Sequence, residues 1–225
     1  MTDSGQPPVL TSGSLATQIY GSMEEAIIDG RFAPGSRLRA GSLAEYFGVS
    51  RIPVREALSA LGEAGWVDLR PRYGVYVRER SQKELAELFE ARQGIESELA
   101  RLAATRATDS DRASLASIVA MSRDAAKRND QAAISRSARE FNAEVRRVSG
   151  NRVLAVIGET LEKRARFYFH PVATELGADW AHGQDRLLGL LHHDRRDDAA
   201  ESARLHIGET GHAVMRLLPA EAFSE

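Results

Sequence analysis

The chain has 225 residues, of which 43% are hydrophobic and 28% are charged, and its net charge is −2, a balance typical of a globular protein. This length allows one large domain or two modest ones. Cysteine is absent, which excludes a disulfide framework, thiolate metal sites and a cysteine nucleophile. No apolar run approaches the roughly 18 residues of a membrane-spanning helix, and residues 1–10 hold no basic residue of the kind that a signal peptide carries. We therefore expect a cytoplasmic protein without membrane association.

The N-terminal quarter of the chain predicts two helices after a polar arm. Residues 1–13 are rich in Pro, Gly, Ser and Thr, a composition typical of disorder. Apolar residues then recur every four positions over about 14–29, which predicts a helix. The pair Pro34-Gly35 indicates a turn. A short helix around 42–47 is predicted next, and Gly48 ends it.

A third helix and a β-hairpin follow. Ser50 is a good N-cap, and Pro53 is tolerated in the first turn of a helix. The apolar stripe of this helix leaves Arg51 and Arg55, four residues apart, on one exposed face. Alternating apolar residues on both sides of residues 70–74 predict two strands joined by a turn. Three helices followed by a hairpin are typical of a winged helix-turn-helix, with a generic small α+β domain as the alternative.

The local charge of this segment indicates a nucleic-acid partner. Between residues 31 and 80 there are nine basic residues, all of them arginine, and five acidic ones. Guanidinium groups can bind guanine and phosphate through two parallel hydrogen bonds. A merely solvated face is the alternative, in which Arg55 pairs with Glu56 or Glu45 and Arg51 only solvates the start of its helix.

From residue 81 onward the strand pattern ends and amphipathic helices take over. About six helices are predicted between residues 81 and 217, which together would form a bundle. The fold class is therefore mainly α, a winged helix-turn-helix followed by an all-α bundle. The predicted divisions are an arm over 1–13, a DNA-binding domain over 14–80, a helical domain over 81–219 and a tail over 220–225.

Several segments of the first domain resemble a known family. The segment from Ile28 to Leu38, the pair Leu43-Ala44 and the segment from Gly48 to Leu58 resemble the GntR family of transcriptional regulators, and the segment from Leu61 to Val77 fits the same family through the wing. The resemblance implies that the third helix enters the major groove and that the wing tip reaches the neighbouring backbone or minor groove. The residues it places on DNA are Ser50, Arg51, Arg55, Arg39, Arg72, Tyr73 and Gly74.

Residues 82–217 are similar to the FCD ligand-binding domain of the FadR subfamily. The similarity is carried by Glu87 to Arg92 with Glu96, by Glu140-Phe141-Asn142 and by Leu205-His206-Ile207. It implies a homodimer that binds a palindromic double-stranded operator, acts as a repressor and responds to a small organic effector, which we expect to be a carboxylic acid or its thioester. A ligand-independent dimer whose helical domain is only structural is the alternative.

Many members of this family bind a divalent metal through an Asp and a His four residues apart and two later His. The positions that match here hold Ala138, Asn142, Gln184 and His206, and an alignment shifted by two residues puts His182 in place of Gln184. One histidine with neutral amides is a weak site for a transition metal. We therefore expect no metal cofactor.

The same polar residues are expected to bind the effector directly. The resemblance implies that Asn142, Gln184 and His206 face one cavity, with Arg92 as partner for a carboxylate. The alternative is that these side chains only satisfy one another in a polar core.

An enzyme is not expected. The chain has no nucleophile elbow, no phosphate loop and no His-Glu-x-x-His spacing. The remaining enzymatic alternative is a metal-dependent hydrolase built on His182, His206 and His212.

Overall fold

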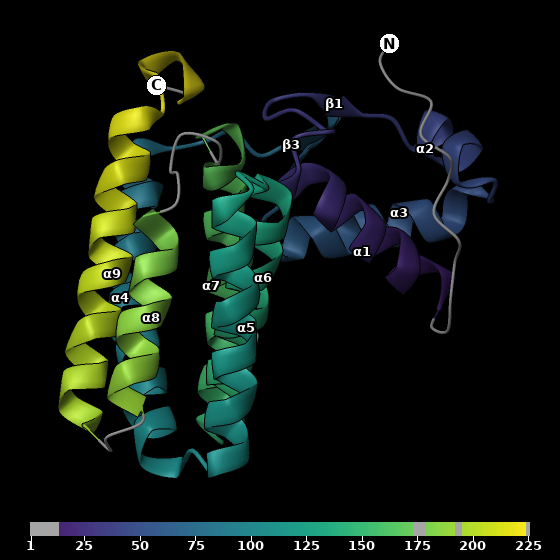
Figure 1. Cartoon of the computed structure of the whole chain (residues 1–225). Helices are drawn as coiled ribbons and strands as arrows, with labels where there is room; N and C mark the ends of the chain where they lie inside the picture. The colour runs from purple at the N-terminus through teal and green to yellow at the C-terminus, as the bar shows by residue number, and fades with distance from the viewer. Residues whose placement is uncertain (1–13, 173–178, 192–194, 224–225) are drawn as a thin grey trace. The chain divides into compact units, whose positions relative to one another are not determined.

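The computed structural model describes residues 14–172, 179–191 and 195–223, and the side chains of residues 179–182 lie outside this description (Figure 1). The chain divides into two compact units that meet between Arg80 and Ser81. The arm predicted over 1–13 lies outside the described residues. Of the predicted tail, residues 220–222 form a short 3-10 helix.

The first unit contains three helices and three short strands. Its elements are α1 (Leu15–Ile28), β1 (Arg37–Leu38), α2 (Ala40–Phe47), α3 (Arg51–Glu63), β2 (Val67–Arg70) and β3 (Gly74–Val77). The hydroxyl of Ser14 accepts a hydrogen bond from the Thr17 amide and so caps α1. Gly48 ends α2 in the left-handed conformation, with φ of 65°, which is a common and favourable C-cap for glycine.

The strands form an antiparallel sheet in the order β1-β3-β2. In the hairpin, Val67 faces Val77 and Arg70 faces Gly74, as the alternating pattern predicts. The strand β1 was not predicted. It is only two residues long, too short to show alternation, and it exists because Leu38 pairs with Val75 far along the chain.

Helices α1 and α3 supply most of the core of the first unit. Ile19, Met23 and Ile27 of α1 are completely buried, as is Leu61 of α3; burial of each such side chain contributes about 1.5–3 kcal/mol. Glu24 is also buried, and it is stabilised because the Trp66 indole and the Tyr20 hydroxyl donate hydrogen bonds of 3.0 and 2.9 Å to its carboxylate. This contact ties the start of the wing to α1.

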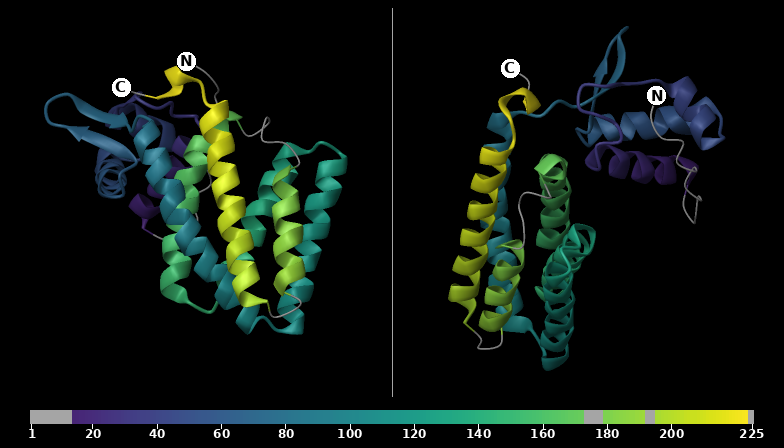
Figure 2. Two further views of the ribbon diagram at one scale, coloured as in Figure 1. Left: turned by 90° about the vertical axis from the view of Figure 1, so that its left-hand side faces the viewer. Right: turned by 45° about the horizontal axis from the view of Figure 1, so that its top comes forward.

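The second unit is a helical bundle (Figure 2). Its helices are α4 (Gln82–Arg106), α5 (Asp109–Lys127), α6 (Gln131–Val148), α7 (Arg152–Phe169), α8 (Asp179–Leu191) and α9 (Arg196–Leu217). The predicted fold class, a winged helix-turn-helix followed by about six helices, is confirmed. None of the helices within the described residues is both long and apolar enough to span a membrane.

Long helices α4 and α9 lie side by side along the bundle (Figures 1 and 2). Gly211 of α9 faces Phe89 of α4, and a Cβ at residue 211 would lie only 2.6 Å from the ring. A small residue at 211 therefore permits this close approach. Further along, an apolar cluster that includes Leu115, Phe141 and Leu191 joins four other helices to α4.

Candidate functional site

Helix α3 presents its first turn to solvent. Ser50 occupies the N-cap position, as predicted, but its exposed hydroxyl makes no capping hydrogen bond. The first amides of α3 are therefore not satisfied by that side chain, and a helix N-terminus of this kind favours an anion such as phosphate.

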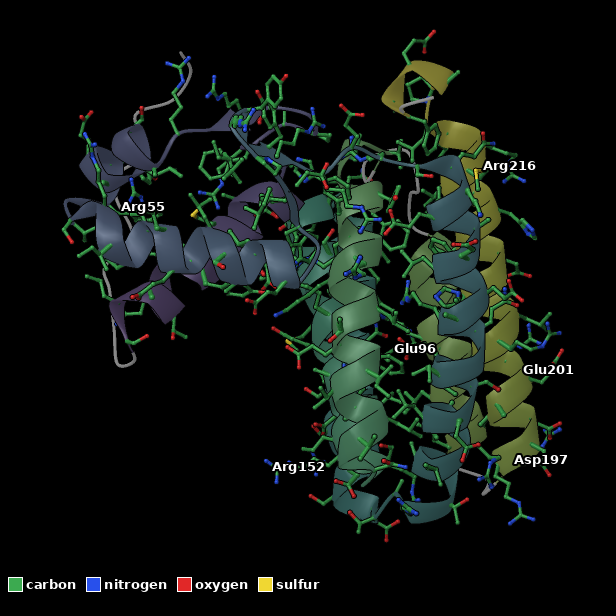
Figure 3. All side chains as sticks on the ribbon, turned by 180° about the vertical axis from the view of Figure 1, so that it is seen from behind. Arg55, Glu96, Arg152, Asp197, Glu201 and Arg216 are labelled. Carbon is green, nitrogen blue, oxygen red and sulfur yellow. The ribbon has the colours of Figure 1, made fainter. Side chains whose placement is uncertain are left out.

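Arg51 and Arg55 are both exposed on α3 (Figure 3 labels Arg55). Neither guanidinium lies within 4.0 Å of a carboxylate belonging to a described residue, so the pairing of Arg55 with Glu45 or Glu56 that formed the alternative interpretation is not formed. By contrast, Arg70 of the wing lies 3.7 Å from Asp68. The two arginines of α3 thus keep their full hydrogen-bonding capacity for a partner.

The tip of the wing is a tight turn with two residues in the left-handed region. Arg72 has φ of 67° and Gly74 has φ of 114°, and the second value is one that favours glycine. Tyr73 lies between them and is 71% exposed. The Tyr76 hydroxyl donates a 3.3 Å hydrogen bond to the Tyr73 carbonyl, which links the backbone of the tip to β3.

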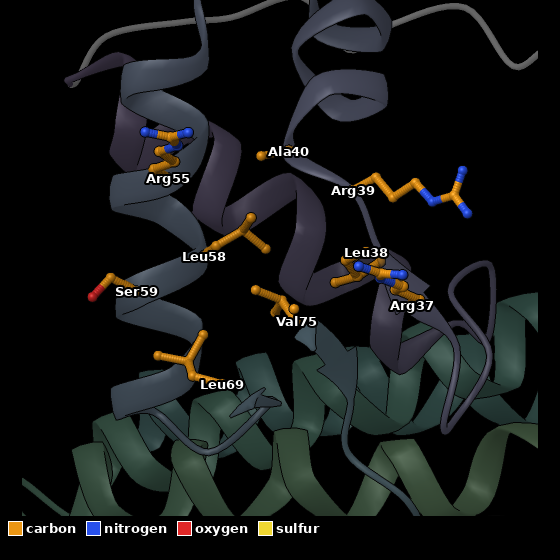
Figure 4. Close-up of a pocket in the computed structure, with 10 residues that line it drawn as sticks. Arg37, Leu38, Arg39, Ala40, Arg55, Leu58, Ser59, Leu69 and Val75 are labelled. Atoms are coloured by element: carbon orange, nitrogen blue, oxygen red, sulfur yellow. The ribbon is translucent and has the colours of Figure 1, made fainter. Parts of the chain in front are cut away.

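A surface groove of about 430 Å³ runs between α3, the start of α2 and the wing (Figure 4). Leu58 and Val75 point into it, and Arg39, the residue at the N-cap position of α2, extends away from α3. Arg37 and Arg55 are the other charged residues that line it. The groove thus has an apolar floor and a rim of three arginines.

Arg37 was missed as a site residue. Its guanidinium lies 5.9 Å from the centre of the Tyr76 ring, and a Cβ at Gly74 would lie 3.1 Å from its Nε. The close approach that Gly74 permits is therefore to this arginine. Arg37 lies next to the wing only because β1 pairs with β3, and no local pattern in the sequence predicts this pairing.

Ile52 is a second residue that the sequence analysis did not single out. Its side chain is 68% exposed beside Arg51 in the first turn of α3. A local signal did exist, because Ile52 lies off the apolar stripe that includes Val54 and Leu58. An exposed large apolar residue among arginines can contact a thymine methyl group in the major groove.

The second unit encloses a small cavity lined by α4, α6, α8 and α9. The predicted residues Asn142, Gln184 and His206 all line it, together with Ala138 and with Glu96, which was not predicted as a site residue. The free space is about 40 Å³. This volume suffices for one to a few waters and is far below the roughly 300–1,000 Å³ of a typical ligand pocket.

Arg92 lies next to this cavity without being part of its wall. It is one turn before Glu96 on α4, the two charged groups are 3.5 Å apart, and their side chains are only 3% and 10% exposed. Figure 3 shows Glu96 in the interior of the bundle. Burial raises the pKa of Glu96, and the guanidinium of Arg92 opposes this shift.

His206 is held neutral in this surrounding. Burial, and to a smaller extent the positive charge of Arg92, together lower its pKa to about 4. A neutral imidazole offers one donor and one acceptor. His206 can therefore hydrogen-bond a ligand without adding charge at pH 7.

Asn142 is engaged elsewhere. Its amide donates a 3.3 Å hydrogen bond to Glu162, which also forms a 2.5 Å ion pair with Arg146. The alternative in which Asn142, Gln184 and His206 satisfy one another is therefore not the arrangement found, because Oε1 of Gln184 is buried without a partner among the described residues.

The residues around this cavity do not fit a divalent metal. Ala138 has no donor atom, Asn142 is a neutral amide directed to Glu162, and His206 is a single imidazole. In the part of the chain that the structure describes, no group of three or more His, Cys, Asp or Glu residues is arranged so that it could hold a metal ion. His182, the alternative to Gln184, belongs to the side chains outside the description.

Two family models match the chain. The model for bacterial regulatory proteins of the gntR family matches residues 15–77, and the model for the FCD domain matches residues 87–209, which is more than half of the chain. Among solved structures, E. coli McbR/YncC has a TM-score of 0.79 at 22% identity, covering 91% of this chain and 99% of McbR, and a GntR structure from Rhodococcus sp. RHA1 has a TM-score of 0.75 at 21% identity, covering 92% and 100%. At such identities the likeness shows the fold.

Curated relatives match a part of the chain. The HTH-type transcriptional repressor RspR of Escherichia coli is 38% identical over 92 residues, 41% of this chain and 40% of RspR. The Nta operon transcriptional regulator of Aminobacter aminovorans is 38% identical over 78 residues, 35% of this chain and 37% of that protein. The match thus spans about two-fifths of the length of these relatives. With both family models matched in order along it, the chain belongs to the GntR family of bacterial regulatory proteins and carries an FCD domain.

Proposed function

We propose that this protein is a sequence-specific DNA-binding transcriptional repressor whose operator affinity is modulated by a small organic molecule bound in the helical unit. The observation that carries the proposal is that Arg51 and Arg55 of α3 are exposed and that neither forms an ion pair with a described residue. Membership of the GntR family supports it, as do relatives described as transcriptional repressors and regulators. Because its partner is chromosomal DNA, we place the protein in the cytoplasm.

Helix α3 would read bases in the major groove. Arg51 and Arg55 can each take O6 and N7 of a guanine, and Ile52 between them can pack against a thymine methyl. Ser50 and the free amides of the helix start would hold a phosphate. These contacts give specificity to a helix whose other face is buried against α1.

The remaining arginines would bind the backbone on either side. Arg37 and Arg39 line the groove beside α3, and Arg72 and Tyr73 form the exposed tip of the wing. Contacts of this kind position the protein and supply affinity that depends on salt, but they do not distinguish sequences.

A homodimer is part of the proposal, because one winged helix reads too few base pairs for useful specificity. An apolar face on α7 supports it: Val153, Val156 and Ile157 are 70%, 61% and 40% exposed and share one side of the helix. We propose that a second copy covers this face. Replacement of Val156 by glutamate should shift the protein to monomer in analytical ultracentrifugation, and a dimer of unchanged stability would refute this face as the interface.

Effector binding would occur at the cavity around Gln184 and His206, without a metal. Treatment with a chelator should therefore leave operator binding and its response to effector unchanged. The small size of the cavity favours one other function, a ligand-independent DNA-binding dimer, because an organic molecule must displace side chains to enter. A metabolite that changes operator affinity in a gel-shift titration would exclude that alternative.

The decisive experiment measures operator binding by fluorescence anisotropy. Arg55→Ala should weaken operator binding by about 1–3 kcal/mol or more and leave the circular dichroism spectrum unchanged. Arg216→Ala is the matched control, since Arg216 lies near the end of α9 in the other unit and is also exposed (Figure 3). Equal operator affinity of the Arg55→Ala variant and the wild type would refute the assignment of α3 as the recognition helix.

A further inference from the structure

Leu69 is a large apolar residue that stays half exposed on the wing. By the alternation of β2, its side chain lies on the same face of the sheet as that of buried Val67. It packs against the last turn of α3, where a Cβ at Gly62 would lie only 2.8 Å from Cδ1 of Leu69. Leu69 is nevertheless 50% exposed. A single exposed leucine is common in proteins, so the surroundings of Leu69 decide what it indicates.

Leu69 borders an apolar channel between α3 and the wing. The groove of about 430 Å³ shown in Figure 4 continues into a second hollow of about 450 Å³ along the hairpin, and the two share Arg37, Leu69, Gly74 and Val75. We call the two together the wing channel. The larger apolar side chains that line it are Leu38, Leu58, Leu69, Pro71 and Val75. An apolar strip thus runs from α3 towards the tip of the wing.

The charged residues that line the wing channel are all basic. No described residue that lines either hollow is acidic, and the basic ones are Arg37, Arg39, Arg55, Arg70 and Arg72. Of these five, Arg70 lies 3.7 Å from Asp68 of the same strand, so the lining keeps a net positive charge. Guanidinium groups bind phosphate with good geometry. The channel therefore suits an extended anion that carries apolar groups between its charges.

Docking on DNA specifies that anion. A helix such as α3 enters the major groove, and a wing reaches into the neighbouring minor groove. The strand that separates those two grooves must then pass between α3 and the hairpin, which is where the wing channel lies. Its backbone alternates phosphates with deoxyribose rings, and the C2′ atom of deoxyribose carries only hydrogens. An arginine-lined channel with an apolar floor complements both parts of this repeat.

We propose that the wing channel holds the sugar–phosphate backbone of one operator strand, and that Leu69 and Val75 select deoxyribose over ribose there. The proposal rests on the proposed function and adds to it a discrimination between DNA and RNA. Phosphates lie on the arginines, and one deoxyribose packs against Leu69 and Val75. A ribose at that nucleotide would bury its 2′-hydroxyl against the two apolar side chains, where the hydroxyl finds no hydrogen-bond partner. Binding of that operator is therefore weaker.

The test is a ribose scan of the operator by fluorescence anisotropy. Single nucleotides of one half-site are replaced, one at a time and on both strands, by the ribonucleotide with the same base. Ribose at one or two adjacent positions of one strand should weaken binding by about tenfold or more, whereas most other positions should tolerate it. Uniform tolerance at every position would overturn the proposal.

A 2′-fluoro nucleotide at the sensitive position separates the hydroxyl from the shape of the sugar. Fluorine favours the same ring pucker as the hydroxyl of ribose does, but it donates no hydrogen bond and is more easily desolvated. The 2′-fluoro operator should therefore recover most of the affinity that ribose removes. Equal losses with ribose and with the 2′-fluoro sugar would trace the effect to the pucker and overturn the role of Leu69 and Val75.

Two leucine variants assign the contact. Leu69→Ala opens the channel to water at the sensitive nucleotide, and the preference for deoxyribose over ribose should fall from about tenfold to less than about threefold. Because both affinities are measured on the same variant, any loss of folded protein cancels in their ratio. Leu15→Ala, which replaces a leucine of α1 that is 38% exposed, should keep the full preference. An unchanged preference in the Leu69→Ala variant would overturn the assignment.

Binding of the unmodified operator by the wild type is the reference of this scan. Operator binding that ribose weakens at no position would refute this inference alone, since the proposed function would stand. Absence of operator binding would refute the proposed function, and the inference that rests on it would fall with it.

Discussion

Gly183 of α8 lies directly against the imidazole of His206 on α9, so closely that a Cβ at residue 183 would overlap the ring atom Nδ1. Both residues line the buried cavity. The absence of a side chain at residue 183 therefore decides where the imidazole lies, and the two helices position it jointly.

The first prediction follows from this contact. Gly183→Ala should force the His206 ring to move and should lower the free energy of unfolding, since overpacking of this kind costs about 1–3 kcal/mol. Gly189→Ala on the same helix is the control, because a Cβ there meets nothing within 4 Å and alanine favours a helix by about 1 kcal/mol over glycine. Urea unfolding should find the Gly183→Ala variant less stable than the Gly189→Ala variant by at least about 1 kcal/mol. Equal stability of the two variants would contradict the prediction and would show that the His206 ring moves without energetic cost.

The second prediction concerns pH. His206 has a pKa of about 4 in the folded chain and an ordinary value near 6.5 when unfolded, so the unfolded state binds more protons between these values. Stability should therefore fall as the pH drops from about 6.5 towards 4 and be unaffected by this group above pH 7, with a total loss of up to about 3 kcal/mol.

Replacement of His206 by glutamine isolates this effect from other titrating groups. Glu96, whose pKa is raised in the same cavity, acts in the opposite sense and is present in both proteins. The stability of the wild type relative to the His206→Gln variant should decline on acidification through that interval. A constant difference between pH 7 and pH 4 would contradict the lowered pKa.

The third prediction concerns the buried ion pair of Arg146 and Glu162. Arg146→Ala would leave the Glu162 carboxylate buried without its cation, which should cost about 3–5 kcal/mol. Arg204 forms a comparable 2.7 Å pair with Glu201, but on the surface, and Arg204→Ala should cost less than about 1 kcal/mol. Chemical unfolding of both variants checks the contrast, and similar losses would mean that burial of the Arg146 pair has no energetic consequence.

The fourth prediction concerns Ile52 and follows from its exposure on α3. Replacing thymine by uracil in the operator removes the methyl group that Ile52 would contact, and it should weaken binding of the wild type by about 1 kcal/mol. The Ile52→Ser variant should bind both operators equally. Met121→Ser, at an exposed apolar residue of the other unit, should retain the preference for thymine. If replacement of thymine by uracil leaves the operator affinity unchanged at every position, Ile52 takes no part in base recognition.

The fifth prediction concerns Arg37, which lies beside the wing. If it binds a phosphate, Arg37→Ala should weaken binding to all DNA sequences alike and reduce the slope of affinity against salt by about one unit. Arg31→Ala removes an arginine that lies 4.0 Å from Asp29 and should leave the slope unchanged. A changed base preference in the Arg37→Ala variant would instead point to direct readout of a base.

Local patterns in the sequence were sufficient to predict helix α3 and its exposed arginines. The spacing of Arg51 and Arg55 places them on one face, and Ser50 marks the helix start, because helix periodicity and capping depend only on residues a few positions apart. The hairpin is local for the same reason. The bundle was predictable as six amphipathic helices, since each carries its own apolar stripe.

Features that join distant segments depended on the tertiary structure. Arg37 comes beside the wing because two residues of β1 pair with β3 almost forty residues later, and so short a strand has no periodicity of its own. Glu96 is four residues after Arg92, a spacing visible in the sequence, but only packing against α6, α8 and α9 buries the pair and brings Glu96 into the cavity wall with Gln184 and His206.

The sequence by itself determined the family, the fold class and the exposed arginines of α3, because these depend on local periodicity and on a long run of matching residues. Among the described residues, the tertiary structure decided which polar atoms are buried without partners. That property depends on burial, and burial arises only when the helices pack together.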